Sequence, residues 1–196
     1  KEKKDLYIEG IQNNGIISHY EYIVNGEGMI EIRHILKPEG KMPLWFPRIG
    51  LTLTVSDALD QVKWYGRGPQ ENYPDRKTGY PTGIYSSTVQ DMYEPYLMPQ
   101  DYGLRTDVRW LQLTADKGIG LQIKMDEWFN FNIYPYSTDN LTKAMYTYQL
   151  QKQNSITLNL DYATTGVGCT ARGVFGAYKA MPQEYRRTIS IRPMMK

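Results

Sequence analysis

Short runs in which apolar and polar residues alternate recur along most of this chain of 196 residues, and they constrain its fold more than any other feature. In residues 49–55 the apolar side chains stand at every second position, which is typical of a half-buried strand. We therefore expect an all-β, mostly antiparallel fold with a single helical turn near 138–145. The same period of two predicts further strands over residues 16–24, 29–36, 108–113, 121–125, 129–133, 156–160 and 189–191.

Two features interrupt this pattern. The alternation in 108–113 breaks after Trp110, which predicts a β-bulge. Residues 66–105 lack sustained alternation and contain five prolines with many tyrosine and glycine residues. Long loops of this kind inside a compact domain are usually functional or form interfaces, and simple docking of domains is the alternative interpretation.

Length and composition favour one domain that spans residues 1–196. Hydrophobic residues make up 41% of the chain, enough for a core, and a net charge of +2 provides no polybasic arm for nucleic acid. No run approaches the ~20 apolar residues that span a bilayer, so no membrane partner is expected. Cys169 is the only cysteine, so neither a disulfide nor a Cys/His zinc site is predicted.

The most distinctive motif is Trp-Tyr-Gly-Arg-Gly-Pro-Gln-Glu-Asn-Tyr-Pro-Asp-Arg at 64–76. Asp-Met-Tyr-Glu-Pro-Tyr follows at 91–96, and Pro-Gln-Asp-Tyr-Gly-Leu-Arg at 99–105. In order and spacing these segments resemble the C-terminal, or small-chain, domain of family 2 glycoside hydrolases of the β-galactosidase type. Residues 135–141 and 161–168 extend the resemblance. The motif residues, interpreted as structural, are Trp64, Gly68, Pro69, Glu71, Asn72, Tyr73, Asp75, Arg76, Asp101, Arg105 and Arg109.

The resemblance implies a galactose-mutarotase-like β-supersandwich and a parent enzyme that hydrolyses terminal β-galactosides with retention. In such enzymes both catalytic carboxylates belong to a barrel domain, and magnesium and sodium are bound by other domains. We therefore expect no catalytic residue, metal or cofactor in this chain. Because the family domain is longer at its N-terminal side, the chain is expected to begin within it, without its first strands.

The resemblance also implies partners and a role. We expect the domain to wall the active-site cleft, to assist binding of a galactoside-type carbohydrate, and to pack against the barrel and other domains. Packing between subunits of a homo-oligomer is a further expectation. The bacterial cytoplasm and periplasm both remain open as its location.

One departure from the family concerns the sugar contact. Family members present a Trp that stacks on the galactose ring after a Gly-x-Gly segment, whereas here 169–173 reads Cys-Thr-Ala-Arg-Gly and no Trp follows. The candidates for substrate binding in its place are Arg172, Phe175 and Tyr178. Asp101 and Tyr102 stand where the family has Glu and Asn, which implies a substrate preference removed from lactose-like galactosides.

Four carboxylates lie in or beside the long loops, on Glu71, Asp75, Asp101 and Asp107. A retaining glycosidase needs two such groups about 5 to 5.5 Å apart, and the spacing of these four establishes no such pair. We expect instead a lattice of Arg–carboxylate bonds that pins the loops, formed with the nearby Arg67, Arg76, Arg105 and Arg109.

The remaining aromatic and reactive side chains are expected to be structural. Strand patterns around Trp64, Trp110 and Trp128 predict core rings, whereas Trp45 lies close to two prolines and is predicted to be exposed. Cys169 is predicted to be a buried, inert residue.

Two other classes of function fit the same residues. A free-standing mutarotase-like epimerase would use His with a carboxylate as acid and base, and His19 and His34 both fall in ordinary strand patterns. A carbohydrate-binding module would present a row of exposed aromatic side chains along one face.

Overall fold

The computed structural model describes residues 4–12, 15–115, 118–169 and 173–195, which form twelve strands and three short helices. The strands are β1 (Lys4–Gln12), β2 (Ile16–Val24), β3 (Ile30–Pro38), β4 (Arg48–Ser56), β5 (Gln61–Arg67), β6 (Thr82–Thr88), β7 (Arg105–Val108), β8 (Trp110–Thr114), β9 (Gly120–Met125), β10 (Phe129–Tyr134), β11 (Ser155–Thr164) and β12 (Tyr185–Met194). The helices are α1 (Thr138–Lys143) and the 3-10 turns η1 (Thr147–Gln149) and η2 (Gly176–Tyr178).

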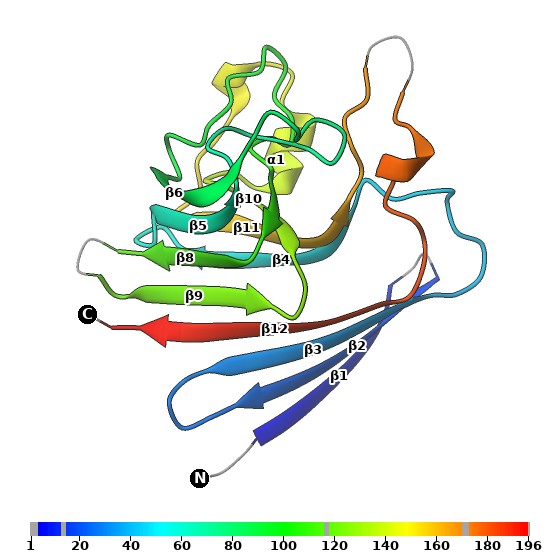
Figure 1. Ribbon diagram of the computed structural model, residues 1–196, viewed down its shortest axis with the longest axis vertical. Coiled ribbons are helices and arrows are strands. Elements are labelled where there is room, and N and C mark those ends of the chain that lie inside the picture. The colour runs from blue at the N-terminus through cyan, green and yellow to red at the C-terminus, as the bar shows by residue number, and fades with distance from the viewer. Residues whose placement is uncertain (1–3, 13–14, 116–117, 170–172, 196) are drawn as a thin grey trace.

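The strands form two antiparallel sheets. An eight-stranded sheet has the order β1-β2-β3-β12-β9-β8-β5-β6, and a four-stranded sheet has the order β4-β11-β10-β7. Figure 1 shows the large sheet rising from β1 at the bottom of the view to β6, with the long loops gathered at the top. The expected all-β, mostly antiparallel sandwich is confirmed.

The main core lies between the two sheets, where alternate residues of each strand face inward. Val62 and Trp64 of β5 and Leu111 of β8 pack from the large sheet, while Phe131 and Leu158 pack from the small one. The small sheet is also covered on its other face, because β11 is buried on both sides. There the loops of residues 90–104, together with α1, form a second cluster around Tyr102, Tyr134, Tyr136 and Leu141.

The strand predicted over 108–113 is in fact two strands of different sheets. β7 pairs with β10 in the small sheet, whereas β8 pairs with β5 and β9 in the large one. The chain crosses between the sheets at Arg109, two residues after Asp107, which adopts a positive φ of 55°. The predicted bulge after Trp110 is therefore wrong, since the irregularity is a change of sheet that falls before that residue.

The predicted helical turn is confirmed as α1. Ser137 caps it, because its side chain accepts a hydrogen bond from the Asn140 amide, and Lys143 pairs with Asp139 one turn earlier. No described helix is long and apolar enough to cross a membrane.

Three predictions of burial are wrong, those for Trp128, Cys169 and Trp110. Trp128 is 60% exposed because it lies in the connection between β9 and β10, outside the strand pattern. Cys169 is exposed because the chain has left the sheet after β11. Trp64 is fully buried as predicted, and Trp45 is 38% exposed. Trp110 is only half-buried, since its neighbour Leu111 takes the inward position.

Candidate functional site

The three motif segments meet at one carboxylate, that of Glu71, which is only 6% exposed. It accepts hydrogen bonds from Arg76 Nη2 at 2.8 Å, from the Gly103 amide at 2.9 Å and from the Tyr73 hydroxyl at 3.3 Å. The Tyr96 hydroxyl is a fourth donor. A buried carboxylate is costly without partners, so Glu71 requires all three segments to be folded together.

The environment of Glu71 also perturbs its neighbours. Burial, together with the hydrogen bond to Glu71, raises the pKa of Tyr96 to about 12, so this phenol remains a donor at neutral pH. Burial raises the pKa of Glu94 as well, and the charge of Glu71 adds to that effect.

Asn72 fastens the first motif segment to β7. It is completely buried; its Oδ1 accepts from the Thr106 amide at 3.1 Å and its backbone amide donates to the Leu104 carbonyl at 2.8 Å. Trp64 donates through Nε1 to the Arg67 carbonyl at 3.0 Å and lies under the Arg105 guanidinium, whose carbon is 5.5 Å from the ring centroid. These contacts are structural and leave no polar group of Asn72 facing solvent.

Gly68 and Pro69 complete this turn. They are joined by a cis peptide bond, and a Cβ added at Gly68 would come within 2.8 Å of the Tyr85 ring. The backbone of the motif therefore approaches β6 more closely than a larger residue would permit.

Asp75 holds the loop that follows β11. Its carboxylate accepts from the Val167 amide at 3.1 Å and from the Gly168 amide at 2.6 Å. A Cβ added at Gly166 would lie 2.3 Å from the Asp75 carboxyl carbon, so only glycine permits this approach. Asp75 thereby fixes the base of the segment that carries Phe175 and Tyr178.

A groove of about 280 Å³, here called the motif groove, opens beside these contacts. Every segment of the resemblance except 135–141 contributes to it. It is lined by Trp45, Pro47, Arg48, Tyr73, Tyr96, Gln100, Asp101, Thr164, Thr165, Gly166 and Val167.

Arg48 forms the charged wall of the motif groove. Its Nη2 donates to Asp161 at 2.5 Å and to Asn132 at 3.0 Å, and its Nη1 donates to Asp101 at 3.3 Å. Burial acts to lower the pKa of Arg48, but Asp161 and Asp101 outweigh it, so the pKa is raised. Asp101, 47% exposed at its side chain, is the carboxylate that remains open to the groove. Sequence reasoning missed Arg48 because it precedes an ordinary strand pattern.

The three candidates for substrate binding are placed differently. Arg172 lies outside the described residues. Phe175 is 68% exposed and caps the turn η2, while Tyr178, 40% exposed, lines a second hollow of about 460 Å³ with Trp128. Thr164, at the end of β11, borders both hollows.

The predicted lattice of Arg–carboxylate bonds forms in part. Arg76 pairs with Glu71, and Arg67 pairs with Asp107 at 2.5 Å. The hydrogen bonds of Lys77 and Arg67 lower the pKa of Asp107, against the opposing and largest single effect of burial. Asp75 instead binds backbone amides.

Arg105 and Arg109 form no ion pair with any described carboxylate. Burial lowers the pKa of Arg105 to about 10, and its Nη1 donates to the Gly103 carbonyl at 2.9 Å. Arg109 donates to the Asp107 carbonyl at 2.6 Å and stacks 4.1 Å from the Trp128 ring centroid. Among the described residues, no cluster of three or more His, Cys, Asp and Glu could hold a metal ion.

The two histidines are not neighbours in a site. In the register of β2 and β3, His34 lies opposite Tyr20 whereas His19 lies opposite Ile35, so the two rings project from opposite faces of the sheet. His34 is buried, its Nδ1 is 2.8 Å from the Tyr162 hydroxyl, and burial lowers its pKa to about 4. The two histidines therefore do not share one site.

Comparison with known proteins gives similarity over most of the chain. The β-galactosidase of Priestia megaterium is 38% identical over 164 residues, which cover 83% of this chain and 16% of that protein. The β-galactosidase of Vibrio cholerae is 36% identical over 152 residues, 77% of this chain and 14% of that protein. That of Lactococcus lactis is 35% identical over 180 residues, 84% of this chain and 18% of that protein.

The crystal structure of a GalM/aldose epimerase homologue from C. elegans superposes with a TM-score of 0.46 at 12% identity, covering 96% of this chain and 68% of that one. The chain spans less than a fifth of the length of the β-galactosidases it matches. The model of the family described as β-galactosidase small chain matches residues 4–191. The chain belongs to the β-galactosidase small-chain family.

Proposed function

We propose that this chain is the non-catalytic C-terminal domain of a family 2 retaining β-galactosidase, in which it walls the active-site cleft and assists sugar binding. The observation that carries the proposal is the meeting of the motif segments at Glu71 beside the motif groove. This network positions the groove beside the loop that carries Phe175. The resemblance to the family implies a sugar contact in that loop.

The contacts of the carboxylates in this chain indicate which domains supply the catalytic groups. Retaining hydrolysis proceeds through a covalent glycosyl intermediate and needs a nucleophile and an acid/base about 5 to 5.5 Å apart. In this chain Glu71, Asp75 and Asp107 are each engaged by several donors that fix the loops. The catalytic pair, and the magnesium and sodium ions of the parent enzyme, are therefore assigned to its other domains.

Sugar binding is assigned to the groove and to the loop beside it. Trp45 and the partly exposed Tyr96 offer aromatic surface, and Asp101 offers hydrogen-bond acceptors for hydroxyl groups. Phe175 replaces the family's stacking Trp, because its exposed ring follows the Gly-x-Gly segment that Asp75 fixes.

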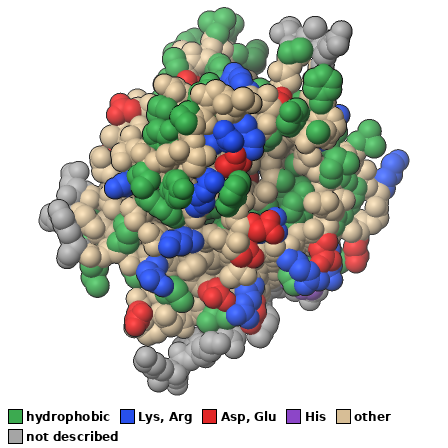
Figure 2. Space-filling view, viewed as in Figure 1, with side chains coloured by type: hydrophobic (Ala, Val, Ile, Leu, Met, Phe, Trp, Pro, Cys, Tyr) green, Lys and Arg blue, Asp and Glu red, His purple; other side chains and the backbone are tan. Residues whose placement is uncertain are grey.

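Packing against the parent is the second role. Side chains that are costly to leave in water are exposed on the loops, among them Leu44 at 85%, Leu97 at 95% and Tyr148 at 80%. Figure 2 shows most hydrophobic side chains of this face in the upper half of the view and most charged ones below. Other domains or subunits of the parent enzyme are the partners proposed for these exposed apolar side chains.

The test uses the full-length enzyme that contains this domain. Phe175→Ala should raise the KM for an aryl β-galactoside roughly fivefold, as loss of one stacking contact of about 1 kcal/mol predicts, with a smaller change in kcat. Ile119→Ala, a comparably exposed apolar side chain that lines neither hollow, is the matched control. An unchanged KM in the Phe175→Ala enzyme would show that this loop does not contact the sugar.

A further inference from the structure

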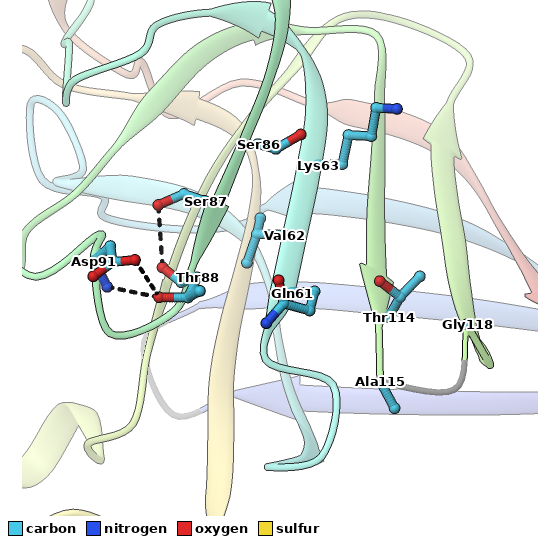
Figure 3. A pocket seen from close by; sticks show the side chains of 10 residues that line it. All are labelled: Gln61, Val62, Lys63, Ser86, Ser87, Thr88, Asp91, Thr114, Ala115 and Gly118. Carbon is cyan, nitrogen blue, oxygen red and sulfur yellow. Dashed lines mark hydrogen bonds between the residues drawn. The ribbon is translucent and has the colours of Figure 1, made fainter.

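A hollow on the outer face of the large sheet shares no residue with the motif groove. It measures about 590 Å³ and lies over β5, β6 and β8, at the edge of the sheet where β6 is the last strand. Its outward side chains are Gln61, Lys63, Ser86, Thr88 and Thr114 (Figure 3). All five end in amide, ammonium or hydroxyl groups.

The strand register places these side chains in rows across the sheet. Lys63 lies opposite Ser86 on one side and Gln112 on the other, and Gln61 lies opposite Thr88 and Thr114. Because Val62 and Trp64 between them are buried in the core, these rows face away from it. The hollow is therefore a polar strip supported by a rigid sheet.

The next row along the same face is apolar. Ile84, Tyr65 and Trp110 lie opposite one another on β6, β5 and β8. Ile84 is 61% exposed, and the Tyr65 and Trp110 ring centroids are 6.4 Å apart. A surface row of this kind is unusual for the water-facing side of an antiparallel sheet, where polar side chains are expected.

Tyr65 is held in place from the end of the row. The Arg109 guanidinium lies between it and Trp128, with its carbon 5.0 Å from the Tyr65 centroid and 4.1 Å from that of Trp128. Cation–π stacking of this geometry restrains partly exposed rings and thereby preorganises the row.

The charge of the hollow selects a neutral ligand. Among the described residues of its lining, there is one cation, Lys63, and one carboxylate, Asp91, which is already engaged by the Thr88 hydroxyl at 2.8 Å. No described carboxylate lies within ion-pair distance of Lys63, so its ammonium group is available as a donor. An aromatic row beside a strip of hydroxyl, amide and ammonium groups matches a sugar chain, whose rings have apolar C–H faces and hydroxyl rims.

We propose that the outer face of β6-β5-β8 is a second, non-catalytic binding site for a neutral oligosaccharide. The site extends from the row of Trp110 to Gln61, which are separated by four residues along β5, or about 13 Å. That length exceeds one pyranose ring, so the site prefers a chain to a monosaccharide. The inference does not depend on the proposed function, because the two sites share no side chain.

The test is an NMR titration of the isotopically labelled 196-residue chain with β-1,4-galactotetraose, cellotetraose and free galactose. Amides of β5, β6 and β8 should shift with a Kd of about 1 mM for at least one tetrasaccharide, at least tenfold tighter than for galactose. Trp110→Ala should weaken binding at least tenfold, Trp110→Phe should restore most of it, and Trp45→Ala in the motif groove should leave it unchanged. Lys63→Ala, an exposed change that leaves the core intact, should weaken binding at least threefold.

Three results would overturn the proposal. One is the absence of shifts on these strands at about 10 mM tetrasaccharide, which would mean that the face only contacts other protein. Another is a set of shifts confined to the motif groove. The third is equal binding by the wild-type, Trp110→Ala and Lys63→Ala chains. If Phe175→Ala left the KM of the full-length enzyme unchanged, that result would contradict the proposed function alone. It would leave the proposal of this second site unaffected.

Discussion

Glu71 Oε2 accepts a hydrogen bond of 2.9 Å from the backbone amide of Gly103, and this contact joins two loops that are 32 residues apart in the chain. The same carboxylate binds Arg76 and Tyr96, so a single buried side chain organises the wall of the motif groove. The geometry makes the loops and the groove mutually dependent.

Replacing Glu71 tests that dependence. Glu71→Gln keeps the size of the side chain but removes the charge that its donors require, and should reduce the free energy of unfolding by about 2–4 kcal/mol. Asp139→Asn, on an exposed pair with Lys143, is the control and should cost less than about 0.5 kcal/mol. Urea unfolding followed by fluorescence measures both, and equal losses would contradict the central position of Glu71.

The loop after β11 depends on a glycine. Gly166→Ala should push the backbone away from Asp75, since the added Cβ would lie 2.3 Å from the carboxyl carbon. The expected loss of stability is about 1–3 kcal/mol, with faster hydrogen exchange at the Val167 and Gly168 amides. Gly176→Ala adds the same atom with no neighbour within 4 Å and should leave exchange at both amides unchanged.

The buried His34 predicts a pH dependence of stability. Burial lowers its pKa in the folded chain to about 4, from 6.5, so the unfolded chain binds the extra proton between these values. Stability contributed by neutral His34 is therefore complete above pH 6.5 and is lost as the pH falls toward 4, by on the order of 3 kcal/mol.

The comparison is with His34→Gln, which has no imidazole to protonate. Unfolding free energies measured from pH 4 to 6.5 should rise more steeply with pH in the wild-type chain, and the two slopes should coincide above pH 7. Parallel curves throughout the lower range would show that His34 is accessible to protons in the folded chain.

The sequence predicted the strands better than the loops for a physical reason. Alternation reports which side of a strand is buried, and the prediction over 16–24 coincides with β2. β6 was missed because its outward side includes the apolar Ile84 and its inward side the polar Ser87, so its pattern does not alternate. The break at Arg109 was mislocated because a change of sheet alters pairing without a change in composition.

The site was predictable as a set of motifs, but not as a geometry. The motif at 64–76 identifies Glu71, Asp75 and Arg76, yet the partners of Asp75 lie more than 90 residues away. Arg48 has no local signal, since its role comes from Asp161 on the neighbouring strand. The burial of Trp128 was predicted wrongly, because the sequence pattern does not distinguish an aromatic residue next to a strand from one inside it.

The most direct test of the central claim is an assay of the 196-residue chain with a chromogenic aryl β-galactoside, beside the full-length enzyme and a variant of it that lacks the catalytic nucleophile. The account predicts that the chain alone, folded and at high concentration, gives no hydrolysis above the level of the nucleophile variant, because Glu71, Asp75 and Asp107 anchor the loops and Asp101 alone of these four carboxylates is open to the groove. Turnover by the isolated chain at even ~1 s⁻¹, within the ordinary range of enzymes, would contradict it.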